Sequence, residues 1–185
     1  MIGTSPSRTA ARAAIVAYLM GKAATGAGGD GTIPYLSVVF PFPAKFTPEG
    51  ELFAGDDPGT QNGAAIWLYI EPQNSERAPN QGKNPGGKFV TYPFALDIVF
   101  RSTKKKTQEA AADNELMLDG LIAAIEADKN AGTDDGTIWS WGEGGTNKGP
   151  DLDLTSYYPR SLNGAAAVTQ INSRLVVKVL QYTTQ

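Results

Sequence analysis

The residues best suited to chemistry in this sequence are carboxylates that lie close together along the chain. Asp151 and Asp153 are two residues apart in a segment with the alternating pattern of a strand. Side chains at that spacing point to the same face of a sheet, where two carboxylates can move a proton or hold a hard cation. A simple polar strand face gives the same pattern. The pair Asp134-Asp135 lacks the spaced ligands and the final glutamate of a calcium-binding loop.

Several kinds of site are excluded because their residues are missing. The 185-residue sequence contains no cysteine and no histidine. Disulfides, thiol nucleophiles, Ser-His-Asp triads and the usual zinc sites are therefore impossible. No phosphate-binding glycine loop, hydrolase nucleophile motif or metalloprotease motif is found either. We therefore expect that the protein is not an enzyme and needs no cofactor.

The composition is that of a folded domain. Hydrophobic residues make up 41% of the chain, and 16 Lys and Arg against 19 Asp and Glu give a net charge of -3. This is enough apolar material for a core, and the charge argues against a dedicated nucleic-acid binder. No apolar run approaches the roughly 20 residues of a membrane span, so we expect no membrane partner. The length predicts a single domain over residues 1–185.

Two segments have the periodicity of amphipathic helices. The first is expected over Pro6–Lys22 with Ser5 as its N-cap, because apolar residues recur there at helical spacing. The second is expected over Gln108–Lys129, capped by Thr107. Its apolar arc, which we expect to be buried, consists of Met117, Leu118, Leu121, Ile122 and Ile125.

Six further segments are rich in β-branched and aromatic residues or alternate in polarity, as strands do. They are Ile33–Phe40, Ala65–Glu71, Phe89–Arg101, Thr137–Trp141, Leu152–Tyr158 and Ser173–Tyr182. Their order along the chain predicts an α+β fold: a single domain with a mostly antiparallel, mixed β-sheet and two main helices packed on it. Runs rich in glycine and proline predict long extended loops at about 41–64, 72–88 and 142–150.

Charge is strongly segregated along the chain. Between Arg77 and Lys106 there are seven basic residues and one acid, whereas between Thr107 and Asp153 there are eleven acids and two bases. Such a chain is suited to head-to-tail association, in which a basic patch meets an acidic patch on the next copy. The run Lys104, Lys105 and Lys106 is the candidate basic contact, although a solvated turn explains it as well.

Four aromatic residues in the C-terminal half of the chain are candidates for a subunit or partner interface. They are Trp139, Trp141, Tyr157 and Tyr158. Packing in the protein's own core explains most such residues. Aromatic side chains also dominate the energetics of interfaces, and Trp139 and Trp141 stand beside a glycine-rich loop.

The order of elements resembles that of the tail terminator family of long-tailed bacteriophages. An opening amphipathic helix precedes an extended, proline-containing strand, Ile33–Val39. The strand Phe94–Phe100, FALDIVF, then leads through a polar turn into the helix Glu115–Asp128, ELMLDGLIAAIEAD. A Thr-Ile-Trp strand follows, and the chain closes on the Tyr157-Tyr158 segment and the strand Leu175–Tyr182. The long insertions depart from the pattern, so another head–tail joining role stays open.

The resemblance implies a structural role in the virion, at the head–tail junction, after assembly in the host cytoplasm. Such proteins form a homo-oligomeric ring, commonly a hexamer, that caps the tail tube protein and docks it to the head–tail connector or stopper protein. DNA passes through the lumen without specific binding, because an acidic wall repels a polyanion. On the second expected helix, Glu115, Asp119 and Glu126 fall within about 40° of one another and are the candidate lumen lining. A solvated helix face is the simpler explanation.

The alternative function is of another class: a surface carbohydrate- or cation-binding β-rich module that uses Asp151, Asp153 and the tryptophans. The two are distinguished by their behaviour in solution. A ring protein elutes far above the mass of one chain. A binding module stays monomeric and gains thermal stability with calcium or glycans.

Overall fold

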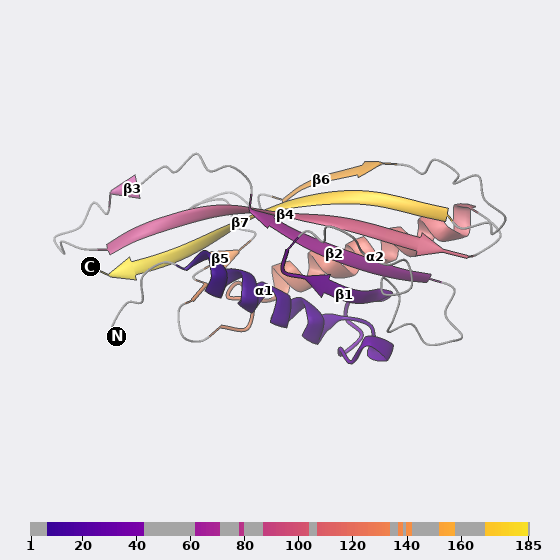
Figure 1. The fold of residues 1–185 in the computed structure, drawn as a ribbon, viewed down its shortest axis with the longest axis horizontal. Coiled ribbons are helices and arrows are strands. Elements are labelled where there is room, and N and C mark those ends of the chain that lie inside the picture. Colours follow the sequence, from indigo (N-terminus) through magenta and orange to yellow (C-terminus); the bar gives the residue numbers. More distant parts are fainter. Residues whose placement is uncertain are drawn as a thin grey trace.

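The protein folds as two helices on one face of a curved seven-stranded sheet, which confirms the expected α+β class (Figure 1). The computed structural model describes residues 7–42, 62–70, 78–79, 87–103, 107–133, 137–138, 140–141, 152–157 and 169–184. The helices are α1 (Arg8–Lys22) and α2 (Thr107–Ala127), with a short 3-10 turn at Thr25–Ala27. The strands are β1 (Leu36–Phe40), β2 (Asn62–Ile70), β3 (Ala78–Pro79), β4 (Gly87–Ser102), β5 (Ser140–Trp141), β6 (Leu152–Tyr157) and β7 (Thr169–Thr184).

The sheet is mixed, with one parallel pair. Its strand order is β1-β2-β4-β7-β5, while β3 pairs with β4 and β6 pairs with β7. β1 runs parallel to β2, and every other pair is antiparallel. β7 is paired along both of its edges, with β4 on one edge and with β5 and β6 on the other.

A long ribbon of β4 and β7 forms the spine of the sheet. Each strand has 16 residues, and they pair without interruption from Gly87 opposite Thr184 to Ser102 opposite Thr169. At the usual rise per residue the ribbon is about 50 Å long. The shorter strands line its two edges (Figure 1).

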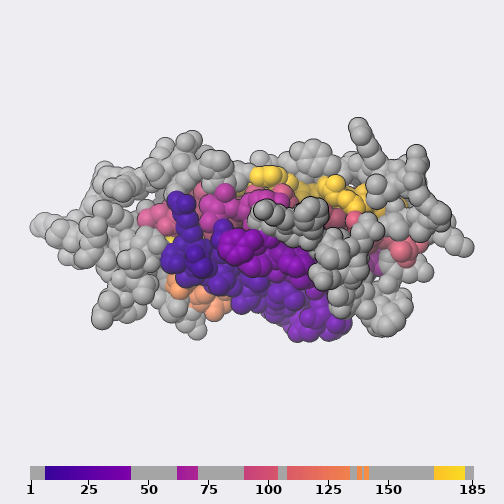
Figure 2. Space-filling model, viewed as in Figure 1, coloured from indigo at the N-terminus to yellow at the C-terminus, as the bar shows by residue number. Residues whose placement is uncertain are grey.

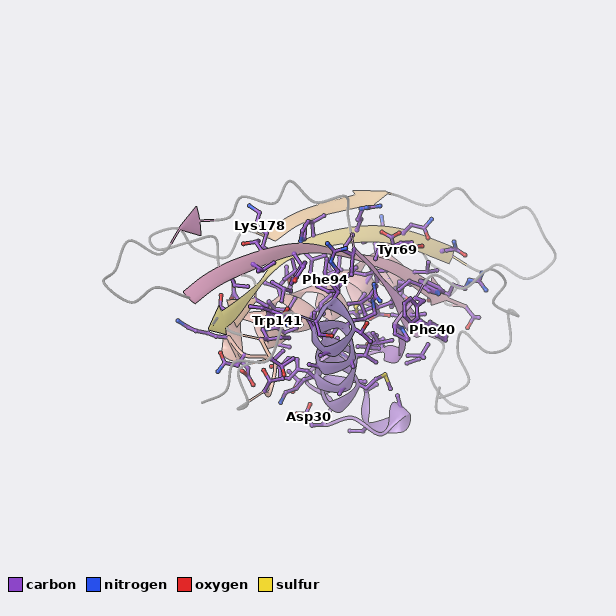
Figure 3. The ribbon with its side chains drawn as sticks, turned by 60° about the vertical axis from the view of Figure 1, so that its left-hand side comes forward. Asp30, Phe40, Tyr69, Phe94, Trp141 and Lys178 are labelled. Atoms are coloured by element: carbon purple, nitrogen blue, oxygen red, sulfur yellow. The ribbon has the colours of Figure 1, made fainter. Side chains whose placement is uncertain are left out.

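The alternation in β4 sets the position of the core. Phe94, Leu96, Ile98 and Phe100, which the sequence places on one face, are all buried. They pack in one hydrophobic cluster with the apolar faces of both helices. The view in Figure 3 shows the sheet arching over the helices, with Phe94 and Trp141 on the helix side.

α1 begins two residues later than expected. Ser7, not Ser5, is the N-cap, because its side chain accepts a hydrogen bond from the amide of Ala10. The predicted apolar face is correct, since Ala11, Ile15 and Leu19 are fully buried. In Figure 2, α1 and the segment that follows it form the indigo and violet part of the surface in view.

The segment before β1 is a turn rather than a strand. β1 begins at Leu36, three residues after the expected start at Ile33. Gly31 and Tyr35 have φ values of 83° and 64°, in the left-handed region, so extended backbone cannot pass through them. Ile33 is nevertheless fully buried. Its amide donates to the carbonyl of Lys22, which folds the turn back onto the end of α1.

The predicted loops contain more strand than expected. β2 begins at Asn62, inside the expected loop 41–64, and β3 and the start of β4 lie inside the expected loop 72–88. Residues 43–61, 72–77 and 80–86 of these two loops, and the whole of the expected loop 142–150, lie outside the described residues.

Candidate functional site

The acidic residues of α2 form an exposed row along the outer side of the helix. Glu115, Asp119 and Glu126 are all exposed, as the helical spacing predicts. Beside them lie Ala112, Leu116 and Ala123, also exposed, and Leu116 has 53% of its surface accessible. We call these six residues the α2 outer face. It combines a carboxylate row with an adjacent apolar row.

The opposite side of α2 is held firmly against the rest of the fold. Leu118, Leu121 and Ile125 are buried there, as expected. Ile122 is only half-buried, because it lies at the edge of the apolar arc next to the acidic row. Gly120 faces the turn before β1, where a Cβ atom would lie 2.8 Å from the carbonyl oxygen of Thr32. The helix can therefore approach this turn so closely only with glycine at that position.

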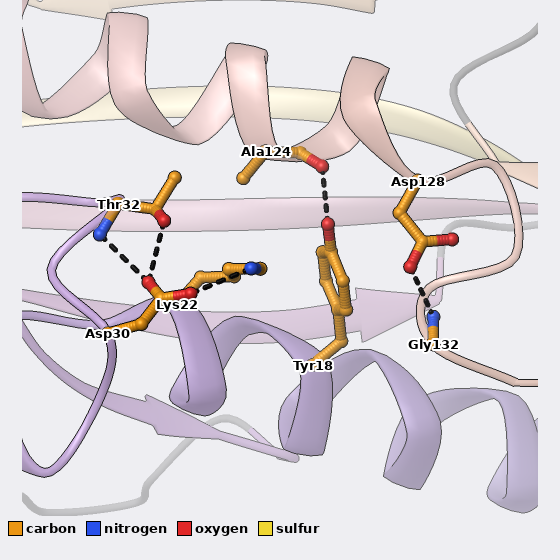
Figure 4. A network of polar contacts seen from close by, with 7 residues as sticks. All are labelled: Tyr18, Lys22, Asp30, Thr32, Ala124, Asp128 and Gly132. Atoms are coloured by element: carbon orange, nitrogen blue, oxygen red, sulfur yellow. Dashed lines mark hydrogen bonds and ion pairs between the residues drawn. The ribbon is translucent and has the colours of Figure 1, made fainter.

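Three hydrogen bonds tie α2 to other elements, two in its first half and one near its C-terminal end. The Asp113 carboxylate accepts hydrogen bonds from Asn62 Nδ2 at 2.5 Å and from the Tyr35 hydroxyl at 3.3 Å. Near the other end, the Tyr18 hydroxyl of α1 donates to the carbonyl of Ala124 at 2.7 Å (Figure 4). Burial raises the pKa of Tyr18, so this hydroxyl keeps its proton at neutral pH. The orientation of the outer face is thus set by contacts with β2, α1 and the turn before β1.

Trp141 lies in the core, which corrects its assignment as a candidate interface residue. Only 1% of its surface is accessible. Its ring meets that of Tyr18 edge to face at 5.4 Å, and its Nε1 donates to the carbonyl of Asp128 at 2.6 Å. The physical reason is the position of β5. It pairs with β7, and the amide of Trp141 donates to the carbonyl of Lys129 just after α2, so the side chain enters the space between the sheet and the helices. It cannot reach another subunit without unfolding this corner.

The other predicted interface residues cannot be placed in the same way. Tyr157 is the last residue of β6, opposite Asn172 of β7, but its side chain lies outside the described residues. Lys104, Lys105, Lys106, Trp139 and Tyr158 also lie outside them, as does Asp151. Their assignment to an interface stays a prediction.

A second surface, which the sequence did not single out, lies on the side of the sheet away from the helices. It carries the half-buried aromatic residues Phe40, Trp67 and Tyr69 and the aliphatic residues Val99 and Val176. Among the described side chains it also carries three cations and one carboxylate: Arg101, Arg174, Lys178 and Asp97. We call these nine residues the outer sheet face. Figure 3 shows Tyr69 and Lys178 on this side.

Strand register brings the outer sheet face together. Asp97 of β4 lies opposite both Trp67 of β2 and Arg174 of β7. Arg174 Nη1 is 3.5 Å from Asp97 Oδ1, and both side chains are partly exposed, at 41% and 33%. Burial and the nearby Asp97 raise the pKa of Tyr69, which therefore stays neutral. Phe40 stacks on Trp67 with ring centroids 5.7 Å apart.

The signal for this surface is visible in the sequence in retrospect. In the segment SRLVVKVL, Arg174, Val176 and Lys178 alternate with Leu175, Val177 and Val179. The second set is fully buried, so the first set must share the other face. The run hides this pattern because valine occupies positions on both faces.

A separate charged contact closes the turn between α1 and β1. Lys22 Nζ lies 2.7 Å from Asp30 Oδ2, and the amide and hydroxyl of Thr32 donate to Asp30 Oδ1 at 2.9 and 2.6 Å (Figure 4). The hydrogen bonds from Lys22 and then Thr32 hold the pKa of the Asp30 carboxyl well below its usual value of 3.8. The same contact raises the pKa of Lys22. Both groups are exposed to solvent, so the contact positions the turn rather than stabilising the fold strongly.

We expect Lys22→Met to move the pKa of Asp30 upward, toward its usual value. Because the native pKa lies below the unfolded one, the contact stabilises the protein above about pH 4, and this stabilisation is lost as the pH falls through the native pKa. Carboxyl NMR titration of Asp30 measures the shift, and Lys129→Met is a matched control that leaves it unchanged. A wild-type Asp30 that titrates at its usual value would contradict the geometry.

Comparison with known proteins does not assign a family. Models of known protein families give no match to this chain, and a search of curated proteins gives none either. Among the described residues, no helix is long and apolar enough to cross a membrane. Within the same residues, no three acidic side chains lie together as ligands for a metal ion.

Proposed function

We propose that this protein is a structural component of a bacteriophage tail. Copies of the chain assemble into a ring, expected to be a hexamer, that ends the tail tube and joins it to the head connector. Its partners are further copies of itself, the tail tube protein and the connector or stopper protein, and DNA passes through the lumen. Its role lies in position and assembly rather than in catalysis, and its place in the virion is the head–tail junction.

The observation that carries this proposal is an exposed acidic row on a helix that is fixed to the core. The α2 outer face has three carboxylates and no cation among its six residues. The buried side of α2 belongs to the hydrophobic core cluster, which fixes the orientation of this row. Such a row is suited to face DNA in a lumen or a basic patch on another copy. The resemblance in element order adds the particular kind of assembly, a tail-terminating ring.

Disruption of the gene in a phage that encodes this chain tests the role directly. We expect DNA-filled heads and separate, unjoined tails in electron micrographs, and restoration of infective particles when the wild-type chain is supplied from a plasmid. Normal, infective particles without the chain would contradict the proposed function.

The alternative, a carbohydrate- or cation-binding module, depends on residues that lie mainly outside the described part of the chain. Asp153 is on β6, but its side chain is among those not described. A rise in the thermal unfolding temperature with calcium or glycans, in a protein that stays monomeric, would favour this alternative.

A further inference from the structure

The guanidinium of Arg12 is partly buried without an anion beside it. Arg12 lies on α1, next to the fully buried Ala11. Its Nε atom is buried and makes no hydrogen bond. Burial lowers the pKa of Arg12, and no carboxylate among the described residues acts against this shift. Burying a charged donor without a partner is unfavourable, and an anion that binds to it recovers that cost.

The side chain of Phe42 supports this guanidinium. The central carbon of the Arg12 guanidinium lies over the Phe42 ring, 4.4 Å from its centroid, at the distance of a cation–π contact. Phe42 follows β1 and has 57% of its surface accessible. Arginine and aromatic residues are enriched in protein–protein interfaces and among the residues that dominate their energetics. The pair therefore presents an oriented charged group on an apolar base.

This guanidinium is better suited to a carboxylate than to DNA. Its Nε and one Nη can donate two parallel hydrogen bonds to the two oxygens of a carboxylate. Binding of duplex DNA instead requires cations that neutralise several phosphates at once. The exposed neighbours Thr9 and Ala13 are uncharged, and Arg8 lies one turn away over the ring of Tyr92. Few cations thus surround Arg12, which favours a single carboxylate as its ligand.

The α2 outer face of another copy can supply this carboxylate. Its three acidic side chains are exposed, and its other three residues are uncharged. We infer that the Arg12–Phe42 pair of one copy binds a carboxylate of the α2 outer face of a second copy. The inference rests on the proposed function, because it names a contact that builds the ring.

The contact joins two different surfaces, one on α1 and one on α2, so it is heterologous. Each copy offers its arginine to one neighbour and its acidic row to the other. Such contacts close into a ring when the rotation between successive copies allows it. A carboxylate that is bound to Arg12 of a neighbouring copy does not face DNA, so at that position the contact replaces the expected lumen lining.

Variants of the two partners test the inference. Arg12→Met removes the charge and keeps an unbranched side chain against Phe42. Arg8→Met, which removes a cation one turn earlier on α1, is its matched control. The row variant converts the three carboxylates of the α2 outer face to amides: Glu115→Gln, Asp119→Asn and Glu126→Gln. Urea unfolding followed by circular dichroism measures the stability of each variant, and sedimentation velocity measures its assembly.

We expect Arg12→Met to assemble at least about tenfold more weakly than the wild type, because a charge-assisted pair is lost. Its protomer stays as stable as the wild type, since the guanidinium has no anion within its own copy. The row variant is expected to weaken assembly as well. Combining it with Arg12→Met adds little, because both remove the same contact. Arg12→Lys restores assembly only in part, since an ammonium lacks the planar fork, and Arg8→Met assembles as the wild type does.

Four results overturn the inference. An Arg12→Met protein that assembles as the wild type does removes it and leaves the proposed ring standing. Losses that add fully in the combined variant place Arg12 and the acidic row in separate contacts. Binding of duplex DNA by the wild type, lost in Arg12→Met, assigns Arg12 to phosphate instead. A wild type that stays monomeric at every concentration and at low salt removes both the inference and the ring.

Discussion

Trp141→Ala is expected to lower the free energy of unfolding by about 3–5 kcal/mol. The side chain is 1% exposed, packs edge to face on Tyr18, and donates the hydrogen bond from its indole nitrogen to the carbonyl of Asp128. Its removal leaves a cavity between β5 and the end of α2 and an unpaired carbonyl. Urea denaturation followed by circular dichroism measures the loss, because circular dichroism does not depend on the tryptophan that is removed.

Trp141→Phe is the matched control, since it keeps an apolar ring and removes the indole hydrogen bond. We expect it to cost less than Trp141→Ala. A core role and an interface role predict different results. If Trp141→Ala left the stability of the protomer unchanged and abolished assembly, Trp141 would be an interface residue after all and the placement in the core would be wrong.

Leu121→Ala is expected to cost about 2–5 kcal/mol, because Leu121 is fully buried on the inner side of α2. The same substitution on the outer side, Leu116→Ala, is its matched control. With 53% of its surface accessible, Leu116 is expected to change stability by no more than about 0.5 kcal/mol. Thermal and urea unfolding of the two variants gives the comparison. Equal losses at both positions would mean that the helix is rotated from the orientation described.

The fold was predictable where one periodicity dominates. In α2, apolar residues at helical spacing predict the buried side and the exposed acidic row together, and both are confirmed except that Ile122 is only half-buried. In β4, strict alternation from Phe94 to Phe100 predicts the face that enters the core. Such patterns are reliable because burial requires every second residue of a strand, or every third to fourth residue of a helix, to be apolar.

Local hydrogen bonding and backbone geometry were harder to predict. Ser5 and Ser7 are both good N-cap residues, and only the structure shows that the Ser7 side chain accepts the hydrogen bond from the amide of Ala10. The segment Ile33–Tyr35 has the composition of a strand. It turns because Gly31 and Tyr35 adopt left-handed conformations, and the buried Ile33 fixes the turn against α1. Tertiary contacts thus override the local preference there.

Of the two candidate surfaces, only the one on a single helix could be predicted from the sequence. The acidic row belongs to one helix, so its spacing alone places its members together. The outer sheet face is built from β1, β2, β4 and β7, and its members meet only through strand register, as when Asp97 lies opposite Arg174. The sequence could not decide whether Trp141 lies in the core or at an interface. Its burial depends on the pairing of β5 with β7 and on the position of Asp128.

The mass of the wild-type protein in solution tests the central claim, that copies of this chain assemble into a ring, most directly. Sedimentation equilibrium at low and at high salt, over a range of concentrations, gives this mass. The account predicts a defined assembly several times the 19.5 kDa protomer at low salt, which weakens as salt screens the charges between copies. A single species of 19.5 kDa at every concentration and salt would contradict it.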